Sequence, residues 1–293
     1  MRVVVVGDTA LDVVARPAGP IVPGDDVRAK VTTSPGGAAA NTAAWLAHSG
    51  ADPTLVSRVG NDHAGGYLRR ALSAAGVRCV FTVDPDAATG CVVVLVDEHG
   101  ERAMLPDRGA NARLLPGDLD PALLDGAVHL HLSGYVLLDA SSVDAGVNAL
   151  GAARRAGLST SVDPQAANLI ADPAGFLDLV RGVDLLLPNT TELAALTGSG
   201  DPRSAGALLG GVRAVAVTSG AAGASWVDRE GVVSVPAEAT ECVDSTGAGD
   251  AFDAGLLAAW LAGGSPRDAL RGGVRAGALA AGRAGAWPQP SIT

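Results

Sequence analysis

Residues 244–250 read DSTGAGD and carry the side chains and backbone with the clearest chemical potential in this chain. Apolar residues recur at helical spacing over 252–261, so the loop is predicted to lie at a helix N-terminus. Free N–H groups and the helix dipole make such a position an anion site, and glycines let a ligand approach the backbone. Asp250 either stabilises the dipole or takes a proton from a hydroxyl beside a bound phosphate. The residues alone leave both roles open.

Two other phosphate-binding loops are excluded by the sequence. Lys30 is the only lysine, so a P-loop with its Gly-Lys-Ser/Thr ending is absent. The glycines around Gly7 and Gly247 also lack the spacing of a dinucleotide-binding fingerprint. Any bound phosphate must therefore be held by a different loop.

Composition limits the class of protein. The net charge of -10 and the pI of about 4.8 argue against a nucleic-acid partner or an anionic membrane surface. The three cysteines are widely spaced, which favours a reducing compartment over a disulfide framework. Neither a signal peptide nor an apolar run long enough to span a membrane is found. We expect a cytoplasmic globular protein.

The order of elements predicts an α/β fold. Arg2–Val6 is an apolar run typical of a strand buried on both faces, and strand and helix patterns alternate from about residue 127. Such alternation implies right-handed crossovers and a mostly parallel sheet. Residues 13–34 and 89–109 differ: they predict an exposed ribbon and a β-hairpin whose turn lies near Glu98–Gly100.

Small and polar residues mark three further junctions. Gly36 and Gly37 precede an alanine-rich helix that carries Asn41 in its first turns. Asn189 with Glu192 three residues later forms a capping box, which needs no ligand to explain it. A buried strand ending at Thr218 leads into a glycine turn.

These motifs resemble the ribokinase-like (PfkB) family of carbohydrate kinases over nearly the whole chain. Residues 244–255, DSTGAGDAFDAG, resemble the family's C-terminal signature, and residues 36–43 resemble its N-terminal signature. The resemblance implies that Asp250 is the catalytic base and that Gly247, Ala248 and Gly249 form the anion hole. It also assigns Asp12, Gly36, Gly37 and Asn41 to the substrate. Ala38 and Thr42 differ from the Lys and Gln of ribose-specific members.

The same resemblance implies the remaining ligands. Asn189, Thr218, Gly220 and Gly223 would lie along ATP. Glu192 would hold Mg²⁺ through water, and Asp244 would be a ligand of a monovalent cation such as K⁺.

The prediction is therefore an ATP-dependent kinase that phosphorylates a hydroxyl of a small sugar or sugar-like substrate. Its expected fold is a three-layer α/β/α core with a mostly parallel sheet (residues 1–12, 35–88 and 110–293). A small β lid (13–34 and 89–109) would cover the substrate and exclude water, and its exposed edge would allow a homodimer. An adenosine-type nucleoside kinase of the same family and a non-catalytic sugar-sensing protein remain alternatives. The sequence does not identify the sugar.

Overall fold

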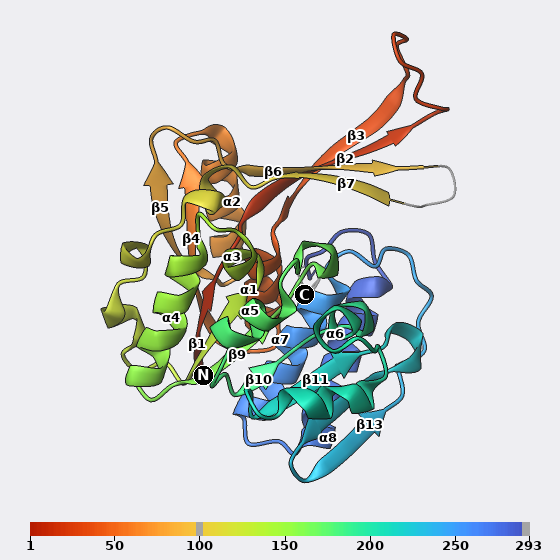
Figure 1. Cartoon of the computed structure of the whole chain (residues 1–293). Coiled ribbons are helices and arrows are strands. Elements are labelled where there is room, and N and C mark those ends of the chain that lie inside the picture. Colours follow the sequence, from red (N-terminus) through yellow and green to blue (C-terminus); the bar gives the residue numbers. More distant parts are fainter. Residues whose placement is uncertain (98–101, 289–293) are drawn as a thin grey trace.

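The computed structural model describes residues 1–97 and 102–288, which form two β-sheets and two helical layers (Figure 1). In spatial order, the strands of the large sheet in this part of the chain are β13 (Gly231–Val235), β12 (Ala224–Asp228), β11 (Ala214–Thr218), β10 (Leu185–Leu186), β9 (Ser159–Asp163), β8 (His129–Ser133), β1 (Arg2–Val6), β4 (Asp52–Gly60) and β5 (Arg78–Asp84). The strands from β11 to β5 pair in parallel, and β12 and β13 add an antiparallel edge. The expected mostly parallel sheet is confirmed.

The valines of β1 explain why this strand is central. Val3 and Val5 point into one hydrophobic cluster, and Val4 and Val6 point into the other. Successive side chains of a strand face opposite sides, so a strand with apolar residues at every position must be covered twice.

Helices provide that cover on both faces of the large sheet. One layer contains α1 (Ala38–His48), α2 (His63–Ala74), α7 (Ala248–Leu261) and α8 (Pro266–Ala281). The other contains α3 (Tyr135–Leu138), α4 (Val143–Arg155), α5 (Pro173–Leu179) and α6 (Thr190–Thr197). Short 3-10 turns are η1 (Gly109–Arg113), η2 (Pro116–Asp118), η3 (Pro121–Leu124), η4 (Ala167–Leu169), η5 (Pro202–Leu208) and η6 (Gly220–Ala222). This is the predicted three-layer α/β/α core.

The small sheet is built from two separate chain segments. Its described strands, in order, are β3 (Ala29–Gly36), β2 (Ala10–Pro17), β6 (Gly90–Val96) and β7 (Arg102–Asp107). They extend away from the core, toward the upper right of Figure 1. The strands begin and end slightly beyond the predicted 13–34 segment, so Asp12 lies inside β2. The turn predicted near Glu98–Gly100 lies outside the described residues.

The register of the small sheet separates an inner face from an outer face. Asp12 pairs with Ser34 and Val92, and residues two positions along each strand share its side. This inner face also carries Val94 and Val96, which are buried, and Arg102, which contacts the core. None of the described helices is long and apolar enough to cross a membrane.

Candidate active site

The loop before α7 is shaped by its glycines. Gly247 caps the helix with a left-handed φ of 73°, and a Cβ at this position would lie 2.7 Å from the Cβ of Ala286. Among the described residues no side chain caps this helix start. The first N–H groups of a helix lack intrahelical acceptors, so those of Gly249 and Asp250 remain available to an anion.

Asp250 is the third residue of α7 and is 9% exposed. Its Oδ2 accepts a hydrogen bond from Asn41 Nδ2 at 2.8 Å, and the side chain of Gln165 also donates to it. Burial, aided by the charges of Asp163 and Asp12, raises the pKa of Asp250 to about 7, although the two amide donors oppose that rise. The carboxyl group is therefore poised to exchange a proton near neutral pH.

A cavity of about 200 Å³ adjoins this carboxyl group. It is lined by Asp163, Gln165, Leu187, Asn189, Glu192, Thr218, Gly247, Gly249, Asp250 and Asp253. Six of the predicted site residues thus line one cavity, although they come from α6, β11 and α7.

Besides Asp250, three further buried carboxyl groups line this cavity, those of Asp163, Glu192 and Asp253. Burial raises the pKa of Glu192 to about 9, and burial also raises the pKa of Asp163 to about 6. Asp253 is 2% exposed, its Oδ2 has no hydrogen-bond partner among the described residues, and burial raises its pKa. Unpaired buried charges are costly, so such a cluster must hold protons or a cation.

The carboxyl groups around the cavity indicate what kind of cation would fit there. No three of their His, Cys, Asp or Glu side chains are placed to hold one metal ion directly. The carboxyl groups of Asp163, Glu192 and Asp253 nevertheless suit a hydrated divalent cation whose other ligands are phosphate oxygens. The cluster therefore fits Mg²⁺ held through water.

The nucleotide residues predicted from the resemblance do not all reach the cavity. Asn189 caps α6, and its N–H and Nδ2 donate to the two oxygens of Glu192 at 2.8 and 2.6 Å. Asn189 also forms a bridge with Thr218, which brings both residues to the cavity. Gly220 and Gly223 lie beyond the end of β11, in and after the η6 turn, and do not line it. They extend the site outward from Thr218.

The predicted substrate residues gather on the other side of Asp250. Asp12 is 9% exposed and burial raises its pKa to about 6. A Cβ at Gly36 would come within 2.2 Å of the Asp12 carboxylate, and one at Gly37, where φ is 94°, within 2.6 Å of the carbonyl of Asp8. Glycine at both positions lets β2 and the start of α1 approach closely. Asn41 then reaches Asp250 from α1.

Asp244 is already paired with other groups. Its Oδ1 accepts from the N–H of Thr246 at 2.8 Å and contacts Arg102 Nη1 at 2.7 Å, and its Oδ2 accepts from the N–H of Gly285 at 3.1 Å. Arg102 also donates to the Thr246 hydroxyl. A guanidinium therefore pairs with the carboxylate, and the monovalent cation expected at Asp244 stays a prediction.

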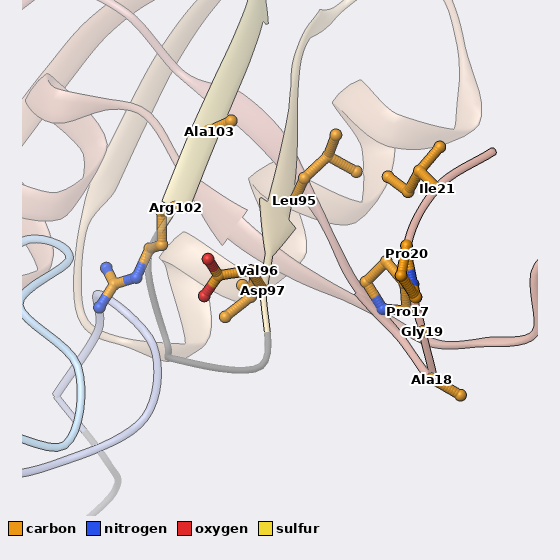
Figure 2. A pocket seen from close by; sticks show the side chains of 10 residues that line it. All are labelled: Pro17, Ala18, Gly19, Pro20, Ile21, Leu95, Val96, Asp97, Arg102 and Ala103. Carbon is orange, nitrogen blue, oxygen red and sulfur yellow. The ribbon is translucent and has the colours of Figure 1, made fainter. Parts of the chain in front are cut away.

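A larger hollow of about 540 Å³ lies at the far end of the small sheet (Figure 2). It is lined mainly by Pro17–Ile21, Leu95 and Val96, and none of the predicted site residues belongs to it. Arg102 borders it, but its guanidinium points away from Leu95 and Ile21 in Figure 2. We place the chemistry in the smaller cavity because that one holds Asp250 and the other buried carboxyl groups.

Sequence reasoning missed several residues that line or support the site. Gln165, the only non-glycine residue with positive φ (71°) in the described chain, donates to Asp163 Oδ2 at 2.5 Å. Asp253 and Trp287 were also missed. The two prolines of the tail Trp287–Thr293 predict a loosely ordered segment, but the indole of Trp287 donates to Asn41 Oδ1 at 2.8 Å. Residues 289–293 lie outside the described part.

Comparisons with known proteins give the family. Residues 1–291 match a protein family described as "pfkB family carbohydrate kinase". An ATP-dependent ribose-1-phosphate kinase of Halopiger xanaduensis is 35% identical, over 88% of this chain and 84% of its own. A Klebsiella pneumoniae fructokinase is 34% identical, over 90% of this chain and 86% of its own.

Solved structures agree with the sequence relatives. An Escherichia coli protein described as a candidate ribokinase II, in complex with ATP and Mg²⁺, superposes with a TM-score of 0.87 at 27% identity, covering 97% of this chain and 94% of the other. The fold, the cavity and these likenesses lead to one conclusion: the chain belongs to the pfkB family of carbohydrate kinases, ribokinase-like phosphotransferases.

Proposed function

We propose that this protein transfers the γ-phosphoryl group of ATP to a hydroxyl of a small sugar or sugar-like substrate, with Asp250 as the general base. The observation that carries the proposal is the buried Asp250 carboxyl group, whose pKa lies near 7, at the start of α7 beside uncapped N–H groups. A base of this pKa matches the operating pH. Asp250 would accept the hydroxyl proton as the oxygen attacks phosphorus.

The amides of Gly247, Ala248 and Gly249 are proposed to stabilise charge on the transferring phosphoryl oxygens. Their support is the left-handed Gly247, which turns the chain so that the start of α7 faces the cavity. The N–H of Ala248 also donates to the Ser245 carbonyl at 3.2 Å, so the phosphoryl group would share it. A single preorganised donor of this kind is typically worth about 3–4 kcal/mol of the barrier.

Glu192, with Asp163 and Asp253 beside it, is proposed to hold the water shell of Mg²⁺. When bound, Mg²⁺ would neutralise charge on the ATP phosphates. Its charge would compensate the buried carboxylates, so binding would displace the protons that these groups otherwise hold. Asn189 fixes Glu192 through the capping box, so the carboxylate is preorganised. A monovalent cation at Asp244 also stays a proposal, and it would have to share that carboxylate with Arg102.

Substrate and nucleotide are proposed to bind on opposite sides of Asp250. Asp12, Gly36, Gly37 and Asn41 would orient the sugar hydroxyls, since Asn41 bonds Asp250 and the two glycines pack beside Asp12 and the residues before it. Asn189, Thr218, Gly220 and Gly223 would lie along ATP, since they lead away from the cavity at the ends of β10 and β11.

The small sheet is proposed to act as a lid that excludes water from the reaction. Its inner face meets the core through Asp12, Val94 and Arg102. No aromatic side chain lies on its described strands, which favours a sugar over the base of a nucleoside. Cytoplasmic location remains an expectation from the sequence.

A homodimer through the lid is also proposed. Val31 and Leu105 lie on the outer face, opposite in register to Asp12, and each is 57% exposed. Burying this surface against a second copy would remove apolar area from water. Light scattering of the wild type and of Leu105→Asp tests this: a monomeric wild type would refute it.

The function is tested by ADP release with ATP and Mg²⁺ across pentoses, hexoses, phosphorylated sugars, keto-acid sugars and nucleosides. We expect turnover with a sugar-like compound and a loss of at least about a hundredfold in Asp250→Asn. Asp144→Asn is the matched control, because Asp144 also lies in the first turn of a helix but is exposed and remote from the cavity. Turnover of Asp250→Asn within about threefold of the wild type would exclude the base role.

A further inference from the structure

The segment Gly285–Trp287 is fixed against helix α1 and the loop 244–247 that precedes α7. The N–H of Gly285 donates to Asp244 at 3.1 Å, and Trp45 Nε1 donates to the carbonyl of Ala286 at 2.8 Å. Ala286 is 4% exposed and packs where a Cβ at Gly247 would lie. Trp287 is therefore held at a defined position beside the start of α1.

The indole of Trp287 determines which way the Asn41 amide faces. An indole nitrogen only donates, so the amide atom that meets Trp287 Nε1 at 2.8 Å must be Oδ1. Nδ2 then faces Asp250 Oδ2, at 2.8 Å. Turning the amide around would oppose two donors at one end and two acceptors at the other.

We propose that Trp287 is a positioning residue: its indole N–H locks the Asn41 amide so that Nδ2 donates to Asp250 and holds the carboxylate in place. The catalytic meaning of this arrangement rests on the proposed function, but the arrangement itself does not. Trp287 touches neither the cavity nor Asp250 directly, and it acts only through Asn41.

The locked donor has a defined electrostatic effect on Asp250. A hydrogen bond to the charged form favours that form, so the Asn41 bond lowers the Asp250 pKa against the rise caused by burial. The other groups that act on this carboxyl are the amide of Gln165 on the β9–η4 connection, Asp163 on β9, Asp12 on β2, Glu192 on α6, Asp253 on α7 and the phenol of Tyr135 on α3. Trp287→Phe leaves all of these in place and removes only the N–H that orients the amide.

The first experiment needs no substrate. Carboxyl ¹³C resonances of Asp-labelled protein are titrated, and the Asp250 signal is identified by its loss in Asp250→Asn. In Trp287→Phe we expect its midpoint to rise by about 0.5–1 pH unit, the size of one hydrogen bond lost from the charged form. Trp226→Phe is the matched control, because it removes an indole bond to Asp228 on β12, next to the edge strand β13, and should leave the midpoint unchanged.

The second experiment measures turnover against pH. With the Asp250 pKa raised from about 7, less carboxylate is present at neutral pH, so Trp287→Phe should lose roughly two- to fivefold in kcat at pH 7 and recover toward pH 9. The KM for ATP should stay within about twofold. A kinase-inactive wild type with the expected ¹³C shift would refute the proposed function but not the role of Trp287.

A third measurement applies even if Trp287→Phe does not fold. In the wild type, the indole ¹⁵N–H resonance of Trp287 should shift with the midpoint of Asp250, and in Asn41→Ala that pH dependence should vanish. An Asp250 midpoint unchanged in Trp287→Phe, or an indole signal that titrates identically without the Asn41 amide, would overturn the proposal and leave Trp287 a packing residue only.

Discussion

Replacing the base should make this protein more stable while it loses activity. Burial raises the pKa of Asp250 from 3.8 to about 7, so ionising this group in the folded state costs free energy. The folded state binds the proton more tightly than the unfolded chain does. The stability associated with this group is therefore full below pH 3.8 and is lost as pH rises to about 7.

The magnitude follows from the linkage relation. One pKa unit corresponds to about 1.36 kcal/mol, so relative to low pH the raised pKa of Asp250 lowers the free energy of unfolding by about 4 kcal/mol at pH 8 and about 1.5 kcal/mol at pH 5. Asp250→Asn removes the charge and keeps a side chain of the same shape. We expect the free energy of unfolding to exceed that of the wild type by up to these amounts, with the larger gain at pH 8.

Urea unfolding at both pH values measures this difference. Asp144→Asn, in the first turn of α4, should change the free energy of unfolding by less than about 0.5 kcal/mol. A destabilised Asp250→Asn at pH 8, or a difference that is the same at pH 5 and pH 8, would show that burial does not strain this carboxyl group. Lost turnover together with gained stability would show that the buried Asp250 carboxyl group destabilises the fold but is needed for activity.

Three further results are expected. Gly247→Ala should lose at least about tenfold in kcat, because it adds a Cβ against Ala286 at a left-handed position. The control Gly263→Ala, with φ of 89° and open space around it, should lose about 1 kcal/mol of stability and no activity. Glu192→Gln keeps the capping box, so the fold should persist while the Mg²⁺ concentration for half-maximal rate rises about tenfold or more; an unchanged Mg²⁺ requirement would contradict the assignment. Rates in potassium and in sodium buffers should agree within about twofold if Arg102 takes the place of a cation at Asp244, and strong potassium activation would support the cation there.

Local signals in the sequence were sufficient for the elements that carry the site. Four valines in a row predict the central strand β1, and the capping box of Asn189 and Glu192 predicts the start of α6. The glycines before Asp250 predict a helix start open to an anion, and the structure has this geometry. These features depend on neighbouring residues, so one sequence contains them.

The carboxyl cluster could not be predicted because it depends on tertiary packing. Asp163 ends β9 and Asp253 lies one turn inside α7, and nothing in their spacing shows that they share a hydrogen bond. Gln165 gives no local sign of its left-handed backbone. The Trp287–Asn41 bond joins residues 246 positions apart, and prolines in the tail argued against order there.

The small sheet is joined to the core at four places: before β2, after β3, before β6 and after β7. A part tied at four points along one side can rock toward the core but cannot swivel freely or detach. The small sheet also cannot be replaced by substituting one continuous stretch of sequence, because β2 pairs with β6, which lies about eighty residues later. To give this chain the substrate preference of a relative, both segments, β2–β3 and β6–β7, would have to be replaced together and in matching register.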